Sequence, residues 1–185
     1  MAQIKLNATY GLTGTLPAVS GANLTSLPAQ GITEADMWRV TTAFTGDAEP
    51  IASNWERNDL TGFDKIGTGM TESSGIFTFP STGIYQITFY LGTYISGDNA
   101  YSDARIQITT DDSSYSIASS GWSGAAQASG ATTSHNSTSQ CIFDVTSTST
   151  HKVRFDSRVA NNSTSTWGDT NENHTYVTFL RLGDT

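Results

Sequence analysis

Residues 73–91, SSGIFTFPSTGIYQITFYL, contain two runs of strand-forming residues that flank a Pro-Ser-Thr-Gly turn. Proline and glycine at this spacing mark a tight connection, so the two runs are predicted to be consecutive strands. The second run is apolar or aromatic on both of its faces. One face carries Tyr85, Ile87, Phe89 and Leu91, and the other carries Ile84, Gln86, Thr88 and Tyr90. A strand of an antiparallel sandwich commonly has one solvated face, so something must cover the second face here.

The chain after residue 35 shows strand patterns and no helical period. Eight to ten short runs separated by turn-rich spacers predict an all-β sandwich or jelly roll. FDKIG, residues 63–67, is expected to be a short strand, and residues 119–139 a long loop rich in Ser, Gly and Ala. HKVRFDSRV, residues 151–159, alternates apolar residues with charged ones. Its charged face is therefore expected on the outside of the sandwich or at its edge.

Length and charge limit the classes of partner. The 185 residues suffice for one domain with an appendage. A formal net charge of −8 without any cluster of Lys and Arg argues against nucleic acid. No segment approaches the roughly 20 apolar residues that span a bilayer, so no membrane insertion is expected. The N-terminus lacks the apolar region of a secretion signal, which predicts synthesis and retention in a cytoplasm, or release by lysis.

Residues 1–34 differ from the rest of the chain and are predicted to form an extended N-terminal arm. The segment repeats Leu-Pro-Ala, is rich in small and polar residues, and has too few large apolar groups to fold alone. We expect it to lie extended against a partner, with a few apolar side chains as anchors. These arm anchors are Leu6, Tyr10, Leu12, Leu16, Val19, Leu24 and Leu27.

The final run, HTYVTFLRL at residues 174–182, is also apolar on both faces. A soluble monomer rarely exposes a large aromatic patch, so the second faces of the two runs are predicted to form a subunit interface. The predicted interface residues are Ile84, Thr88, Tyr90, Val177 and Phe179. The alternative is a central strand covered by a loop such as residues 119–139.

The stretch FDKIGTGMTESSGIFTFPSTGIYQITFYL resembles the signature of the globular head of complement component C1q and its tumour-necrosis-factor-like relatives. The matching residues are Phe63, Asp64, Lys65, Gly75, Phe77, Pro80, Gly83, Tyr85 and Phe89. The terminal TYVTFLRLGDT stands where that family has its last aromatic-bearing strand. The resemblance covers roughly residues 35–185 and implies a C1q/TNF-like jelly-roll sandwich that assembles as a homotrimer. The sequence differs from the animal members of that family in showing no collagenous stalk.

The arm and the domain together resemble short virion-associated proteins of marine tailed bacteriophages, and GTLPAVSGANLTSLP resembles linkers of phage tail-fibre proteins. This resemblance implies a virion structural protein that docks to other virion proteins through its arm. The linker-like arm favours a tail fibre or appendage that binds the host surface. Its candidate ligand is a host cell-surface glycan. A capsid decoration protein is favoured by the small size. A lectin-like module not tied to a virion is the alternative from another class.

Catalytic and metal-binding motifs are absent from the sequence, so we predict no enzyme activity, no metal and no cofactor. His135, His151 and His174 lack ligand spacing, and Ser-containing catalytic motifs do not occur. The Asp- and Asn-rich loops around Asp111 and Asp169 could supply some calcium ligands but do not follow the EF-hand spacing, and such loops are more often turns.

Tyr101, Trp122 and Trp167 are candidate ligand-binding residues because aromatic side chains among Ser and Gly are common in adaptable binding surfaces. Trp122 would lie in the predicted 119–139 loop. The competing interpretation is that Trp122 and Trp167 close the ends of the sandwich. The single cysteine, Cys141, alternates with Phe143 and Val145 and is predicted to be buried and structural.

Overall fold

The computed structural model describes residues 31–127 and 130–185. The residues from Gly31 to Thr185 form one compact unit. The arm anchors predicted between residues 6 and 27 lie outside the described residues. Glu34, at the end of the predicted arm, is tied to the domain: its carboxylate accepts hydrogen bonds from the backbone N–H groups of Thr68 and Gly69 at 3.2 and 2.9 Å.

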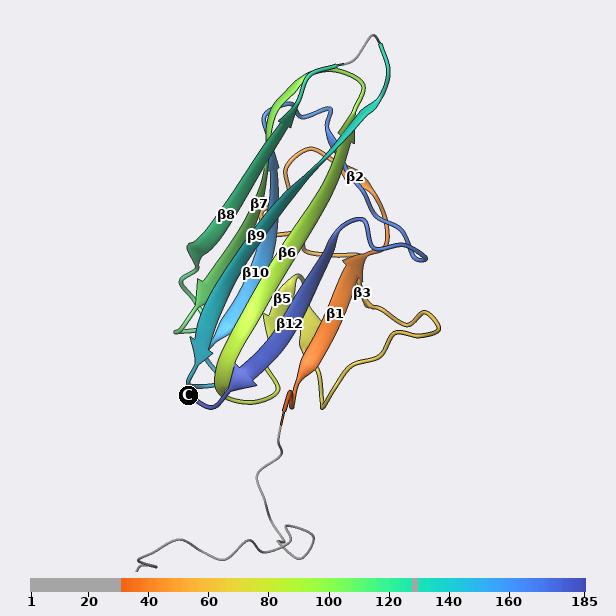
Figure 1. The fold of residues 1–185 in the computed structure, drawn as a ribbon. Helices are drawn as coiled ribbons and strands as arrows, with labels where there is room; N and C mark the ends of the chain where they lie inside the picture. The colour runs from red at the N-terminus through yellow and green to blue at the C-terminus, as the bar shows by residue number, and fades with distance from the viewer. Residues whose placement is uncertain (1–30, 128–129) are drawn as a thin grey trace, which may run out of the picture. The chain divides into compact units, whose positions relative to one another are not determined.

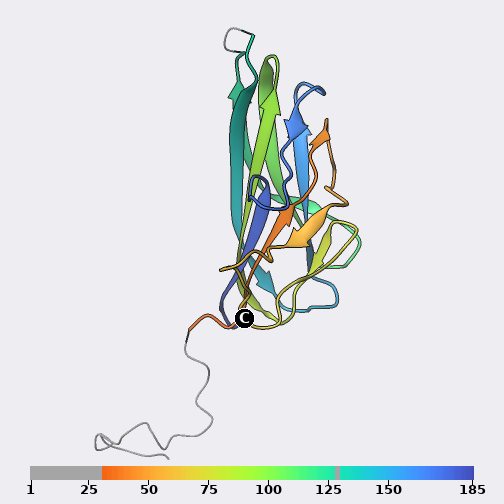
Figure 2. The same cartoon turned by 90° about the vertical axis from the view of Figure 1, so that its right-hand side faces the viewer.

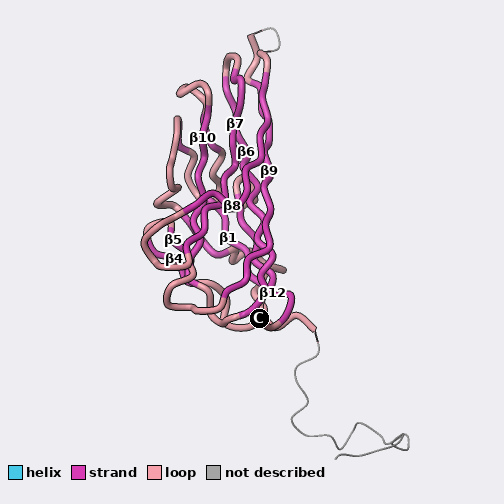
Figure 3. The backbone as a smooth tube through the Cα atoms, turned by 90° about the vertical axis from the view of Figure 1, so that its left-hand side faces the viewer, coloured by secondary structure: helices cyan, strands magenta, loops and turns pink. Residues whose placement is uncertain are grey.

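The described residues form two antiparallel sheets that pack face to face (Figures 1 and 2). Figure 3 shows that this part of the backbone consists of strands and loops. The strands are β1 (Ala35–Val40), β2 (Phe44–Thr45), β3 (Trp55–Arg57), β4 (Thr71–Ser73), β5 (Ile76–Thr78), β6 (Gly83–Ile95), β7 (Asn99–Thr109), β8 (Ser116–Ala125), β9 (Thr133–Val145), β10 (Lys152–Val159), β11 (Ser165–Thr166) and β12 (Tyr176–Gly183). Within residues 31–127 and 130–185, no helix is long and apolar enough to cross a membrane.

The first sheet has the order β2-β11-β6-β12-β1-β3, and β9 pairs along the other edge of β6. The second sheet has the order β4-β5-β10-β7-β8. The two long strands β6 and β9 are paired over their whole length, from Gly83 opposite Val145 to Ile95 opposite Thr133. The 73–91 stretch therefore crosses between the sheets: β5 belongs to the second sheet and β6 to the first.

Aromatic rings from both sheets fill the interior at the end where β5 lies. Phe77 of β5 lies 5.4 Å from Phe155 of β10 and 5.4 Å from Phe179 of β12, measured between ring centroids. Phe89 of β6 lies 5.2 Å from Phe155. Each fully buried ring of this kind contributes on the order of 1.5–3 kcal/mol to folding. The alternation of β6 points Tyr85, Ile87, Phe89 and Leu91 into this core, as expected from the sequence.

Hydroxyl and amide groups replace the aromatic rings toward the Ile95 end of β6. Thr93, Ser102 and Asn99 are buried, and the Ser102 hydroxyl lies 3.1 Å from the Thr93 hydroxyl and 2.9 Å from the Asn99 side-chain nitrogen. Hydrogen bonds among these groups offset the cost of burying them. The interior thus has an apolar part and a polar part.

Two sequence-based expectations about single elements were wrong. Most of residues 119–139 belongs to strands β8 and β9 and not to a loop, because the small residues suit the close approach of those strands: a side chain at Gly121 would meet the Thr138 carbonyl oxygen at 1.9 Å. FDKIG is a loop joined to β1 only by a bridge between Ile66 and Ala35. Strand β10 lies in the middle of the second sheet with its charged face on the outside, as expected, although Asp156 on that face is fully buried.

Candidate functional site

The outward face of β6 and β12 carries a row of aromatic, aliphatic and Thr side chains. The register places Tyr176 opposite Tyr90, Thr178 opposite Thr88, and Leu180 opposite Gln86. The rings of Tyr90 and Tyr176 are stacked, with centroids 5.1 Å apart. We call this surface the β6–β12 outer face and define it by Ile84, Gln86, Thr88, Tyr90, Tyr176, Thr178 and Leu180.

The predicted interface residues divide between two environments. Ile84, Thr88 and Tyr90 lie on the β6–β12 outer face, as predicted. Val177 and Phe179 do not: both are buried in the core of the same chain. The two faces of β12 were therefore assigned in the wrong order, because both are apolar and only the pairing with β6 decides which one points inward. The outward-facing residues of β12 are Tyr176, Thr178 and Leu180.

The β6–β12 outer face continues onto β9 through Ile142, whose surface is 67% exposed. Ile142 was not among the predicted site residues. The signal was present in the sequence, since the inward alternation of Cys141, Phe143 and Val145 places Ile142 on the opposite side. The suggestion that residues 119–139 cover this face is excluded, since β9 extends the sheet beside β6 and does not lie over it.

Two hollows interrupt the outer side of the first sheet. The first has a volume of about 350 Å³, and its lining includes Met37, Asn58, Phe63, Gln86, Thr178 and Leu180. The second has a volume of about 310 Å³, and its lining includes Tyr90, Ser134, Asn136, Trp167, Asn173 and His174. Both hollows border the β6–β12 outer face, so this side of the sandwich is uneven.

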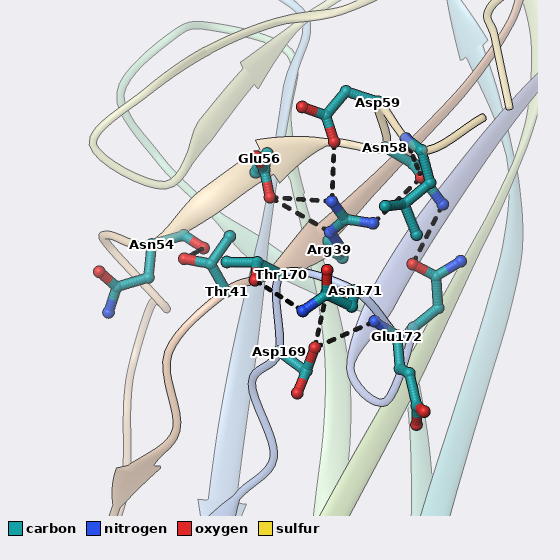
Figure 4. A network of polar contacts seen from close by, with 12 residues as sticks. Arg39, Thr41, Asn54, Glu56, Asn58, Asp59, Asp169, Thr170, Asn171 and Glu172 are labelled. Atoms are coloured by element: carbon teal, nitrogen blue, oxygen red, sulfur yellow. Dashed lines mark hydrogen bonds and ion pairs between the residues drawn. The ribbon is translucent and has the colours of Figure 1, made fainter.

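A buried arginine organises the β3 side of this sheet (Figure 4). Arg39 of β1 is fully buried, and its guanidinium donates to the Glu56 carboxylate at 3.1 and 3.2 Å. It also donates to Asp59 at 2.9 Å and to the side-chain oxygen of Asn58 at 3.1 Å. Because a buried guanidinium needs full compensation, these contacts hold residues 56–59 against β1. The arginine therefore shapes the wall beside the first hollow.

Trp122 and Tyr101 come together in the structure, whereas Trp167 lies elsewhere. The rings of Tyr101 on β7 and Trp122 on β8 are 5.1 Å apart at an interplanar angle of 38°. Trp122 is 64% exposed and therefore does not close an end of the sandwich. The Trp167 ring packs beside the second hollow, with its centroid 4.2 Å from that of Tyr94 and 5.2 Å from that of His174.

A serine–histidine contact occurs inside the polar part of the interior, between the Ser102 hydroxyl and Nε2 of His135 at 2.8 Å. Ser102 is fully buried, and Nδ1 of His135 has no hydrogen-bond partner within the described residues. A catalytic serine needs an accessible hydroxyl and a base that a third group orients. The pair is therefore a structural contact, and burial lowers the pKa of His135.

The two acidic loops are turns whose first Asp caps the backbone. Asp111 accepts hydrogen bonds from the backbone N–H groups of Ser114 at 2.7 Å and Ser113 at 2.9 Å, which lower the pKa of its carboxyl. Asp169 accepts from Asn171 at 2.6 Å and Glu172 at 3.1 Å, with the same effect on its pKa (Figure 4). Among the described residues, no three His, Cys, Asp or Glu side chains are grouped as a metal site would require.

Cys141 packs against the hydrophobic core, as its alternation with Phe143 and Val145 predicts. Burial raises the pKa of its thiol to about 11. A thiol with that pKa is almost entirely protonated at neutral pH and is a poor nucleophile. Cys141 is therefore a structural residue.

Comparison with solved structures places this arrangement among known folds. The chain is similar to the Eiger TNF of S. frugiperda, with a TM-score of 0.60, 11% identity, and coverage of 82% of this chain and 93% of that one. The fold is a C1q/TNF-like jelly roll. This C1q/TNF-like domain is also similar to murine APRIL at pH 5.0 (TM-score 0.54, 13% identity, 80% and 98% coverage). It is similar to the globular domain of zebrafish complement 1qA as well (TM-score 0.53, 10% identity, 82% and 99% coverage). No protein-family model and no curated protein sequence matches the chain.

Proposed function

We propose that this chain is a homotrimeric structural protein of a tailed-bacteriophage virion, a component of a tail fibre or appendage that binds the host surface. The C1q/TNF-like domain would point outward, and residues 1–34 would attach it to other virion proteins. The observation that carries the proposal is the β6–β12 outer face with Ile142 beside it. The proposal assigns the chain no catalytic role.

The β6–β12 outer face favours a second copy of the chain as its occupant. Tyr90, Tyr176, Leu180, Ile84 and Ile142 are aromatic or aliphatic side chains that gather on one side of the sheet. The face carries no charged side chain among its defining residues, so its burial costs little desolvation. A three-fold assembly uses two different patches of each subunit, and an uneven apolar sheet face beside two hollows can serve as one of them.

The virion location is supported by the sequence resemblance of the arm to phage tail-fibre linkers. Three arms on one trimer would bind together, so weak attachment by each arm becomes firm through effective concentration. Deletion of residues 1–30 tests the role of the arm and keeps Glu34 with its partners in the domain. The shortened protein should trimerise with unchanged circular dichroism but should be missing from particles. Incorporation equal to that of the full chain would refute attachment through the arm.

Electron microscopy of purified virions with antibody-labelled protein tests the location. Label on the tail or its appendages is the expected result. Label spread over the capsid would replace the tail assignment by a decoration role. Absence from purified particles would overturn the virion proposal and favour the lectin-like module, for which the exposed Tyr101–Trp122 pair is the favouring observation.

A further inference from the structure

Trp122 is an exposed indole that is held in one orientation. Its Nε1–H group donates a hydrogen bond to the Ser120 hydroxyl at 2.6 Å, and the Ser120 hydroxyl donates to the carboxylate of the fully buried Asp103. The Tyr101 ring supports the indole from the neighbouring strand. An aromatic ring that is both exposed and oriented loses little conformational entropy when a ligand stacks on it. We call Tyr101 and Trp122 the aromatic platform.

A row of paired charges begins directly beside the aromatic platform. The register places Trp122 opposite Asp103 and Asp103 opposite Arg158, so all three side chains lie on the same outward face. Arg105 donates to Asp103 at 2.6 Å, and Arg158 contacts Glu49 at 2.8 Å. With strands about 4.8 Å apart, the platform and Arg158 are separated by on the order of 10 Å, a span comparable with a disaccharide.

The row offers donors and acceptors without net charge. Arg105 and Arg158 are matched by Asp103 and Glu49, and Arg105 also contacts Glu49 at 3.7 Å. An anionic ligand would have to break these pairs and would meet a chain whose formal net charge is −8. A neutral ligand with several hydroxyl groups can instead donate to the Glu49 carboxylate, which is 41% exposed, and accept from the half-exposed Arg158 guanidinium.

Asp156 lies on the same face but is fully buried. It lies opposite Arg105 in the sheet, and Gln107 donates to one of its carboxylate oxygens. The other oxygen is buried and has no hydrogen-bond partner within the described residues. Because this oxygen is not accessible from the surface, Asp156 belongs to the support of the face and does not contact the ligand.

We propose that the outward face of β7, β8 and β10 binds a neutral hexopyranose unit of a cell-surface polysaccharide, with the sugar ring stacked on Trp122. The C–H groups on one side of a pyranose ring carry partial positive charge and pack well on the negative face of an indole. The hydroxyl groups of the adjoining sugar unit then reach the Arg158–Glu49 pair, two strands away from Trp122. This inference rests on the proposed host-surface role and adds the face, the central residue and the ligand chemistry.

The test is binding of three neutral trisaccharides, built from glucose, galactose or mannose, to the full chain. In ¹⁵N-labelled protein, the indole N–H peak that is absent from Trp122→Ala identifies Trp122. This peak should shift saturably with at least one neutral trisaccharide and not with a trigalacturonate of the same length. Trp122→Ala should raise the dissociation constant of that trisaccharide by about tenfold or more, measured by saturation-transfer NMR.

Ile117→Ala is the matched control, since Ile117 lies on the same strand and is also exposed, at 52%. It should bind as the parent chain does. No shift of the Trp122 peak with any neutral trisaccharide up to 50 mM, or a shift with trigalacturonate alone, would overturn the inference. So would loss of trimerisation in Trp122→Ala, since Trp122 would then be a subunit contact. If sedimentation shows an intact trimer that fails to bind sugar, the ligand assignment fails while the assembly proposal stands.

Discussion

Phe179 of β12 lies 5.4 Å from Phe77 of β5, ring centroid to ring centroid, across the interior of the sandwich. This contact joins β12, the last strand of the chain and a member of the first sheet, to the second sheet. Phe179 is only 2% exposed. The residue therefore stabilises the fold of a single chain. A charged residue at this position would unfold the domain, so its effect on assembly alone could not be measured.

Phe179→Ala should lower the free energy of unfolding by about 3–5 kcal/mol, because it removes a buried ring and leaves a cavity. Urea denaturation followed by circular dichroism, at one fixed protein concentration, measures the change. Ile117→Ala is the control, since this side chain is 52% exposed on the outward face of the second sheet and should cost the folded chain far less. Equal losses in the two variants would contradict the burial of Phe179 in the core.

Tyr90→Glu should convert the trimer to a folded monomer, because it places a charge in a contact that excludes water. Sedimentation equilibrium should give three times the 19.7 kDa chain mass for the parent and the single-chain mass for the variant. Ile117→Glu, on the outward face of the second sheet, should remain trimeric. A Tyr90→Glu protein that stays trimeric at micromolar concentration would exclude the β6–β12 outer face as the interface.

Arg39→Lys should destabilise the domain by about 1–3 kcal/mol, since an ammonium group cannot reproduce the forked contacts to Glu56, Asn58 and Asp59. Thermal unfolding at 0.1 and 1 M salt measures the loss. The difference should persist at high salt because the guanidinium is buried. Arg158→Lys serves as a control on the outward face of β10, since its half-exposed side chain pairs with Glu49 alone. An unchanged midpoint for Arg39→Lys would show that the network contributes nothing to stability.

Stability should decrease as the pH falls below about 6.5, the usual pKa of histidine, because burial lowers the pKa of His135 in the folded chain. Between the lowered folded pKa and 6.5, the unfolded chain binds more protons, so the free energy of unfolding rises with pH in that window. His135→Gln should remove this dependence, and the difference between the two urea-denaturation curves from pH 7.5 to 5 measures it. Identical pH profiles for the two proteins would contradict the assignment.

Asp156 acts in the opposite direction. Burial raises its pKa, so the folded chain binds the extra proton first and gains stability relative to the unfolded chain as the pH falls through that raised value. This is why the histidine comparison is made between a parent and a variant that share Asp156.

The sequence determined the fold class. The alternation in residues 83–95, the Pro-Ser-Thr-Gly turn before it and the strand patterns after residue 35 predicted an all-β sandwich or jelly roll, and the inward residues of β6 were predicted correctly. It also placed Ile84, Thr88 and Tyr90 on the outward side and Cys141 against the core. These features follow from period-two alternation, which is local and can be read without tertiary contacts.

Only the tertiary structure decided which apolar face of β12 is the core, since Val177 and Phe179 differ little in character from Tyr176 and Leu180 and the register with β6 separates them. It also decided that Ser- and Gly-rich residues form β8 and β9, because small side chains permit an approach such as that at Gly121 that local propensity does not reveal. The meeting of Tyr101 with Trp122, and the burial of Asp103 opposite Trp122 and of Asp156 on the same sheet, depend on strand order. Strand order arises from contacts far apart in the chain, and no local pattern of residues contains it.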